Sequence, residues 1–203
     1  MNFFEQFSTS LFEFHDEQIN FESADEVKVS KTQFLYDASL KAKWISDFFF
    51  SKEITLPGRS SLENLKWLIA SLAAGKIVNI VADDIELPGD NIVSCNEVNS
   101  LSIKQSIEYL KKYFFDHARD AELVLMTSGS TGRPSKVRLG FTEFCHQAVV
   151  VGNDLDLTEK DRQLFYMPLN YVYGLSVAMS AMFRNSVLVE TAHTLDEPNS
   201  FFE

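Results

Sequence analysis

The sequence predicts an α/β protein: a layered, largely parallel sheet with flanking helices. Three observations support this fold class. Helical and strand-like segments alternate along the chain. The continuous apolar run from Leu123 to Met126 is typical of a strand that is buried on both faces of a parallel sheet. A helical apolar stripe that ends at Gly75 leads directly into the β-branched segment from Ile77 to Ala82.

The first half of the chain contains a well-marked helix between two predicted strands. Ser60 and Glu63 fit a capping box at the start of that helix, and Gly75 supplies its left-handed stop. The expected elements of this half are an amphipathic helix carrying Phe3, Phe4, Phe7, Leu11 and Phe14, a small hairpin at 17–30, a helix at 32–49, and strands at 52–57, 77–82 and 92–95.

The second half repeats the alternation. Ser102 and Gln105 fit the capping box of a further helix, whose predicted inward face holds Ile103, Ile107, Leu110 and Phe114. The remaining expected elements are strands at 123–126, 137–139, 164–167 and 187–189 and helices at 142–151, ending near Gly152, and at 175–183.

Composition excludes several classes of protein. The 203 residues are 45% apolar and 23% charged, which is typical of a folded globular chain of one domain or two small ones. A net charge of −11 disfavours nucleic acid and anionic lipid as partners, so an anionic ligand needs a local site. We find no signal peptide, no apolar run of the ~18–20 residues that a membrane helix needs, and no Cys or His at metal-ligand spacing. These features predict a cytoplasmic protein with no membrane or nucleic-acid partner and no metal site of its own.

The one basic region of this acidic chain ends on its richest cluster of glycine and hydroxyl residues. Residues 101–138 carry seven basic and four acidic side chains, and residues 127–132 hold four hydroxyls and two glycines. Glycine lets a ligand approach the backbone amides, while hydroxyls and cations donate to phosphate oxygens. The spacing differs from that of a P-loop, a dinucleotide fingerprint or a serine-hydrolase elbow. By this chemistry alone, the segment is either a phosphate-binding loop or a solvent-exposed turn.

The segment from Thr127 to Val137 resembles the phosphate-binding signature of the adenylate-forming superfamily, whose pattern is Thr-Ser-Gly-Ser/Thr-Thr-Gly-x-Pro-Lys-Gly-Val. The matching residues are Thr127, Ser128, Gly129, Ser130, Thr131, Gly132, Pro134 and Val137. Ser135 stands where the family usually has Lys, and Lys136 stands where Gly is common. The resemblance implies that the ATP phosphates are bound by Thr127, Ser128, Gly129, Ser130, Thr131, Gly132 and Lys136.

Two further segments agree with this resemblance, which extends from about residue 25 to the end of the chain. Residues 65–75 resemble the family's helix that ends in Ala-Gly before a strand. Residues 167–175 resemble its Pro-Leu-x-His-x-x-Gly segment, which lines the pocket for the carboxylate substrate. Tyr171 stands at the His position and Gly174 at the Gly position, so both are implied to line that pocket. For Tyr171, an aromatic side chain packed at a strand end is the alternative.

Members of this superfamily use Mg·ATP to convert a carboxylic acid into an acyl-adenylate plus pyrophosphate, and then transfer the acyl group to a thiol or other acceptor. The resemblance therefore implies ATP and Mg²⁺ as ligands, an acyl or aryl carboxylic acid as substrate, and coenzyme A or a carrier protein as acceptor. It assigns no catalytic residue within this chain.

We expect residues 1–203 to be an incomplete N-terminal domain of an AMP-dependent ligase that lacks the C-terminal domain and is inactive alone. One alternative is a non-catalytic nucleotide- or acyl-binding module that keeps the fold without the chemistry. The other is an unrelated α/β domain with a phosphate-binding Ser/Gly loop.

Overall fold

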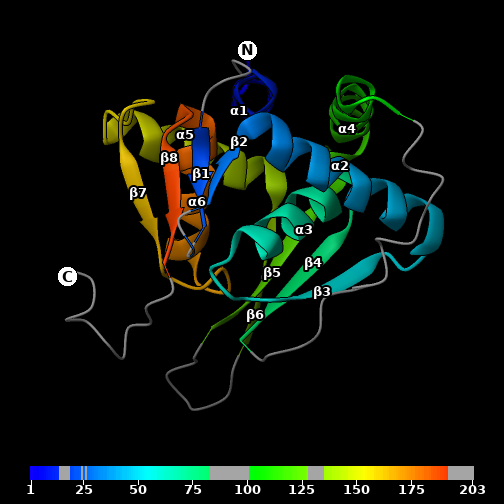
Figure 1. Ribbon diagram of the computed structural model, residues 1–203. Helices are drawn as coiled ribbons and strands as arrows, with labels where there is room; N and C mark the ends of the chain where they lie inside the picture. Colours follow the sequence, from blue (N-terminus) through cyan, green and yellow to red (C-terminus); the bar gives the residue numbers. More distant parts are fainter. Residues whose placement is uncertain (14–18, 24, 26, 83–100, 128–134, 192–203) are drawn as a thin grey trace.

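The computed structural model describes residues 1–13, 19–23, 25, 27–82, 101–127 and 135–191 (Figure 1). Its helices are α1 (Phe3–Phe12), α2 (Lys31–Phe48), α3 (Leu62–Ala73), α4 (Ile103–His117), α5 (Phe141–Asp154) and α6 (Val172–Arg184). Its strands are β1 (Ile19–Glu22), β2 (Lys28–Ser30), β3 (Glu53–Pro57), β4 (Ile77–Val81), β5 (Glu122–Thr127), β6 (Ser135–Gly140), β7 (Arg162–Phe165) and β8 (Val187–Glu190).

The described strands form two four-stranded sheets, with orders β2-β1-β8-β7 and β3-β4-β5-β6. The pairs β1–β8, β7–β8, β3–β4 and β4–β5 are parallel, while the pairs β1–β2 and β5–β6 are antiparallel. The α/β class with largely parallel pairing is therefore confirmed. The partition into two sheets differs from the single sheet that the sequence predicts, because β1 pairs with β8 from the opposite end of the chain.

Alternation along β3 decides which face of its sheet is covered. Ile54 and Leu56 are buried, whereas Glu53 and Thr55 point the other way and are exposed. Helix α3 packs on β3 and β4, and α2 and α4 pack in turn on α3 (Figure 1). Glu53 and Thr55 therefore belong to the face of the sheet that points away from α3.

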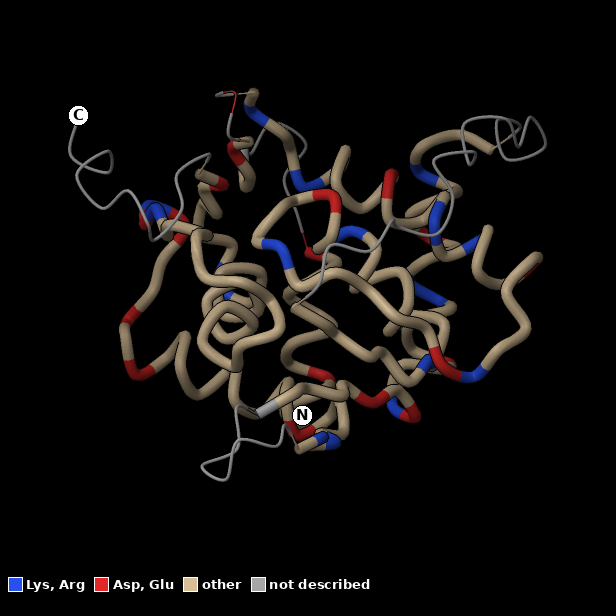
Figure 2. Tube along the Cα trace, turned by 90° about the horizontal axis from the view of Figure 1, so that it is seen from below, with Lys and Arg blue, Asp and Glu red and all other residues tan. Residues whose placement is uncertain are grey.

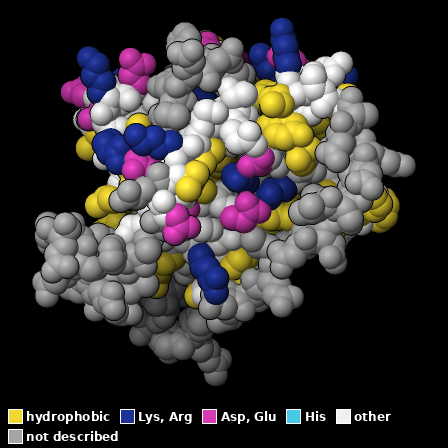
Figure 3. All heavy atoms as spheres, viewed as in Figure 1, with side chains coloured by type: hydrophobic (Ala, Val, Ile, Leu, Met, Phe, Trp, Pro, Cys, Tyr) yellow, Lys and Arg dark blue, Asp and Glu magenta, His cyan; other side chains and the backbone are white. Residues whose placement is uncertain are grey.

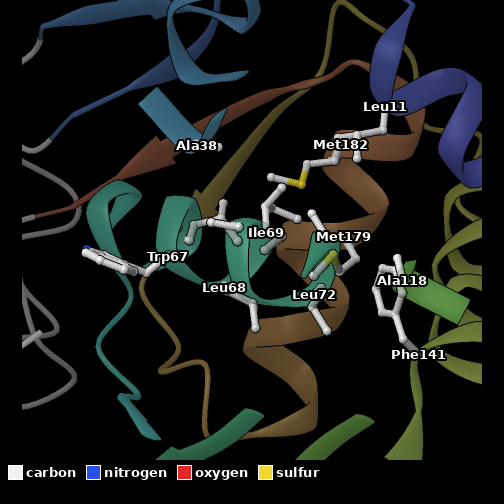
Figure 4. Close-up of a cluster of buried hydrophobic side chains, with 14 of the residues drawn as sticks. Leu11, Ala38, Trp67, Leu68, Ile69, Leu72, Ala118, Phe141, Met179 and Met182 are labelled. Carbon is white, nitrogen blue, oxygen red and sulfur yellow. The ribbon is translucent and has the colours of Figure 1, made fainter. Parts of the chain in front are cut away.

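Helix α3 is the centre of the hydrophobic core. Ten of its twelve residues are buried, which is typical of a helix surrounded by other elements. Ile69 and Leu72 lie beside Met179 and Met182 of α6 (Figure 4). Because α6 contacts β7 and β8, this contact joins the helices of one sheet to the helices of the other.

Phenylalanine side chains of α1 join the same two halves. Phe4 and Phe12 lie 5.9 and 5.5 Å, centroid to centroid, from Phe114 of α4. Phe7 meets Phe141 of α5 edge to face at 5.9 Å, the arrangement that aromatic quadrupoles favour. The Phe-rich start of the chain is thus a helix that packs on the core.

Basic and acidic residues are interspersed along the chain trace (Figure 2). On α2 and α3, Lys66 pairs with Asp37 at 2.7 Å and Lys41 pairs with Glu63 at 2.8 Å. Figure 3 shows acidic and basic side chains interleaved over this part of the molecule. Among the helices that the structure describes, none is long and apolar enough to span a bilayer.

Two helix boundaries differ from the sequence prediction. Ser61, not Ser60, caps α3, because the Ser61 side chain accepts from the amide of Asn64, and the Ser60 hydroxyl is used elsewhere. Helix α5 continues through Gly152, which serves close helix packing and not termination. A Cβ at Gly152 would lie 2.8 Å from Cγ of Arg184 on α6.

Other local predictions have mixed outcomes. The hairpin at 17–30 and the Ser102–Gln105 capping box are confirmed, and Gly75 ends α3 with a φ of +63°. The inward placement of Ile103 is wrong: this first residue of α4 is 46% exposed. The predicted strand at 92–95 lies outside the described residues.

Candidate functional site

The predicted phosphate loop leaves one edge of the second sheet. Because β3, β4 and β5 are parallel, their last residues, Pro57, Val81 and Thr127, lie toward the same edge. Ligands of open α/β sheets bind outside this carboxyl edge. Thr127 ends β5 there, while 128–132, the remainder of the predicted Ser/Thr/Gly motif, lie outside the described residues.

Lys136 is brought back to this sheet as the second residue of β6, directly across from Met126 of β5. Its side chain is exposed and lines a shallow pocket of about 210 Å³. The lining consists of Glu53, Thr55, Asn79, Ile80, Val81, Val124, Met126 and Lys136. Since Glu53 and Thr55 point away from α3, this pocket lies on the sheet face opposite that helix.

The two described cations on β6 have different electrostatic environments. Arg138 lies 3.4 Å from carboxylate oxygens of both Glu53 and Glu122, so its charge is largely compensated. Within the described part of the chain, Lys136 has no ion-pair partner closer than 4 Å. Lys136 is therefore the cation on this strand that is available to an anionic ligand.

Tyr171 and Gly174 lie together at the start of α6, on the side of the molecule that belongs to the other sheet. The amide of Tyr171 donates to the carbonyl oxygen of Pro168 at 3.1 Å, and its side chain is 53% exposed. This exposure does not fit the alternative in which the ring is packed at a strand end. Gly174 is buried, and a Cβ there would collide with the carbonyl oxygens of Met167 and Pro168. The glycine is required so that α6 can begin so close to the preceding turn.

Residues 58–62, which run from the end of β3 to the first residue of α3, connect the carboxyl ends of the two sheets, and we call them the strap. The amide of Gly58 donates to the carbonyl oxygen of Val81 in β4 at 2.7 Å. The carbonyl oxygen of Gly58 accepts from the amide of Leu169 at 2.5 Å. The hydroxyl of Ser60 donates to the carbonyl oxygen of Tyr166 at 3.0 Å. The strap thus attaches the turn before Tyr171 to the edge at which β5 ends.

Glu190, the last residue of β8, completes this connection. Its Oε2 accepts from the amide of Leu62 at 3.1 Å, at the start of α3, where the helix dipole favours a carboxylate. Burial raises the pKa of the Glu190 carboxyl, and the hydrogen bond from Leu62 opposes that rise. Sequence reasoning missed Gly58 and Glu190; the only local signal was a Pro-Gly pair after a strand, which indicates a turn and nothing more.

The motif residues are therefore divided between two places that the strap joins. Thr127 and Lys136 lie on the second sheet, and Tyr171 and Gly174 lie beyond the strap on α6.

Comparison with solved structures shows that this fold is similar to the folds of VinN, NpsA and MatB. VinN in complex with L-aspartate has a TM-score of 0.69 with 11% identity, covering 98% of this chain and 65% of VinN. The N-terminal subdomain of NpsA from Klebsiella oxytoca has a TM-score of 0.66 with 18% identity, covering 98% and 56%. ATP-bound MatB from Rhodopseudomonas palustris has a TM-score of 0.65 with 13% identity, covering 98% and 47%. At these identities the likeness shows the fold.

The sequence is similar to those of several 2-succinylbenzoate–CoA ligases. The chain is 27% identical over 146 residues to the 2-succinylbenzoate–CoA ligase of Geobacillus sp. (strain WCH70), which covers 70% of this chain and 28% of the ligase. It is 36% identical over 73 residues to the same enzyme of Bacillus licheniformis, which covers 36% and 15%. The matches span less than a third of the length of these relatives, and no model of a known protein family matches the chain. The resemblance to the adenylate-forming superfamily is confirmed.

Proposed function

We propose that this chain is the part of an AMP-forming ligase that holds the phosphates of Mg·ATP beside a carboxylic acid. The reaction joins the acid to the α-phosphate, giving an acyl-adenylate and pyrophosphate. A thiol or another acceptor then takes the acyl group. In this proposal the chain acts in the cytoplasm.

The observation that carries the proposal is the position of the hydroxyl-rich motif. Thr127, the first residue of this motif, ends β5 at the carboxyl edge of parallel strands, and Lys136 lies across from Met126 without a described ion-pair partner. The chemical problem is the approach of a carboxylate to a polyphosphate, both of which are anions. Preorganised amides, hydroxyls and a cation around the phosphates reduce that repulsion. Thr127, the residues at 128–132 and Lys136 are the groups we assign to this task.

Mg²⁺ in this site depends on the nucleotide for its ligands. The described residues contain no cluster of three or more His, Cys, Asp or Glu that could hold a metal ion. Mg²⁺ is commonly bound by phosphates and water with only one or two carboxylates, so the described donor set is compatible with Mg²⁺ that arrives with ATP. When bound, the ion would neutralise phosphate charge.

The acid is assigned to the start of α6, where Tyr171 is exposed and Gly174 lets the helix begin close to the preceding turn. The curated relatives are named for 2-succinylbenzoate and CoA, and the VinN structure holds L-aspartate. These names support a carboxylic acid as the substrate class. Coenzyme A or a carrier protein is the acceptor class that the proposal includes.

Calorimetric titration of the 203-residue chain with Mg·ATP tests the proposal. We expect saturable binding with a Kd of about 0.1–1 mM, which is roughly −5.5 to −4 kcal/mol. A Thr131→Val/Gly132→Val variant should lose this binding, and Lys136→Gln should weaken it several-fold. Lys160→Gln, an equal charge change at an exposed position on a distant turn, is the matched control and should bind as the wild type does.

Absence of binding by folded wild-type chain, or equal binding by all variants, would contradict the proposal. Ser135 at the family's usual Lys position favours the alternative of a non-catalytic module, and acid-dependent formation of pyrophosphate by this chain would contradict that alternative.

A further inference from the structure

We propose that the strap, residues 58–62, positions the acid-binding turn relative to the phosphate loop, and that Gly58 is its positioning residue. This inference rests on the proposed function, because it assigns the two parts of the ligand to the two sheets. The inference adds Gly58 to the proposed site. Gly58 would contact neither the phosphates nor the acid and would act through Asn170 and Leu169.

The first evidence is that Gly58 bonds in both directions. Its amide is held by Val81 at the end of β4, the strand next to β5, at 2.7 Å. Its carbonyl oxygen holds the amide of Leu169 at 2.5 Å, two residues before Tyr171. A single residue of the strap therefore lies between the edge that carries the phosphate loop and the turn that carries Tyr171.

The second evidence is the closeness of this contact. A Cβ at Gly58 would lie 2.5 Å from Oδ1, 2.8 Å from Cβ and 2.9 Å from Cγ of Asn170. Asn170 is only 8% exposed, and the position of its Cβ is fixed by the backbone, so a rotamer change cannot relieve all three contacts. An alanine at residue 58 would therefore displace the turn itself.

Backbone strain does not account for this glycine. Among the described glycines, Gly75 alone has a positive φ, so alanine at residue 58 is compatible with the local backbone. Gly58→Ala consequently reports on the spacing between strap and turn. A displacement of about 1 Å between reacting groups can cost as much as ~100-fold in rate.

The strap itself is held firmly enough to act as a spacer. Nδ2 of Asn64 donates to the carbonyl oxygens of Pro57 and Arg59 at 3.3 and 3.1 Å. The Ser60 hydroxyl and the Leu62 amide attach the rest of the strap to Tyr166 and Glu190. Movement of the turn against the strap thus has to break defined hydrogen bonds.

Hydrogen–deuterium exchange tests the docking of the turn without any ligand. We expect Gly58→Ala to speed exchange at least several-fold in a peptide that covers 166–175, through loss of the Leu169 hydrogen bond. Gly140→Ala is the matched control, because a Cβ there meets only the terminal carboxyl group of Glu143, which can rotate away. The double variant Gly58→Ala/Asn170→Gly removes all three close contacts. Its 166–175 peptide should therefore exchange as slowly as the same peptide of the Asn170→Gly single variant.

A ligand that joins an acyl group to the α-phosphate position of the nucleotide tests the positioning role. The probe is the sulfamoyl-adenosine analogue of 2-succinylbenzoyl-adenylate, which carries the acyl and nucleotide parts in one molecule. We expect Gly58→Ala to weaken its binding about 10–100-fold while the Kd for Mg·ATP changes less than twofold. The Gly58→Ala/Asn170→Gly variant should recover most of the loss.

Two results would overturn the inference. One is unchanged exchange at 166–175 in Gly58→Ala, which would show that the turn does not depend on the strap. The other is an equal loss of affinity for the analogue and for Mg·ATP, which would show a general structural defect. If the wild-type chain binds neither ligand, the proposed function fails and the positioning role fails with it, while the exchange data still decide whether Gly58 docks the turn.

Discussion

Replacing Lys31 by Met tests a buried charge at the junction of three helices. Lys31 is the first residue of α2 and is 3% exposed. Its Nζ donates to the carbonyl oxygens of Ser10 and Glu13, at 2.6 and 2.8 Å, and to the Asn185 side chain. Burial lowers the pKa of Lys31 to about 7, and the negative charge of Glu13 opposes this shift.

The sign of the pH dependence follows from the lowered pKa. Between pH 7 and the ordinary Lys value of 10.5, the unfolded chain holds a proton at Lys31 that the folded chain has released. The free energy of unfolding therefore rises with pH across this window, by up to about 1.4 kcal/mol per unit. From pH 7 to 9.5 the contribution amounts to about 3 kcal/mol. Below pH 7, both states are charged at Lys31 and the contribution becomes constant.

Urea unfolding at several pH values from 6 to 9.5 measures this effect. Lys31→Met keeps the apolar stem but cannot titrate. Between pH 7 and 9.5, the free energy of unfolding of the wild type should therefore rise by about 3 kcal/mol relative to that of the variant. Other titrating groups are common to both chains and cancel in the difference. An exposed control, Lys160→Met, should follow the wild type in parallel. Parallel curves for Lys31→Met as well would refute the reasoning and show that the three oxygen acceptors keep the ammonium group charged throughout.

Two further predictions concern buried positions. Gly174→Ala should lower the free energy of unfolding by about 1–3 kcal/mol, because the carbonyl oxygens of Met167 and Pro168 occupy the space of the new methyl group. A variant as stable as the wild type in a urea titration would contradict this packing. Cys145 is 1% exposed, and burial raises the pKa of its thiol. In a Cys95→Ser chain, the Cys145 thiol should therefore react with a disulfide reagent only on unfolding. Rapid labelling of the native chain would show that the thiol is accessible.

Local signals predicted the secondary structure well wherever a short motif determines it. The Ser102–Gln105 capping box and the stop at Gly75 need only neighbouring residues, and both are confirmed. The choice between Ser60 and Ser61 depends on a distant partner, because the Ser60 hydroxyl is bonded to Tyr166. No local pattern could therefore have decided it.

The partition into two sheets could not be predicted from the sequence either, because it also depends on partners that are distant along the chain. Pairing of β1 with β8 joins Phe21 to Leu188, and nothing near either residue specifies the other. Apolar runs indicate that a strand is buried, but they do not name its neighbour. The α/β class was predictable, and the strand order was not.

The candidate site shows a similar division. The resemblance to the adenylate-forming superfamily implied roles for Lys136 and Gly174, and the structure gives each a physical setting: an exposed cation on β6 and a close approach at the start of α6. The roles of Gly58 and Glu190 come from hydrogen bonds to Leu169 and Leu62 across the strap, so these residues were visible only in three dimensions.

Phosphorus NMR of Mg·ATP titrated with the 203-residue chain tests the central claim most directly. The account predicts that the β- and γ-phosphate resonances shift or broaden as protein is added, and that the Thr131→Val/Gly132→Val variant abolishes the change while remaining folded. Unperturbed resonances in the presence of folded wild-type protein, or equal perturbation by the variant, would contradict it, because the phosphates would then not be held by the loop after β5.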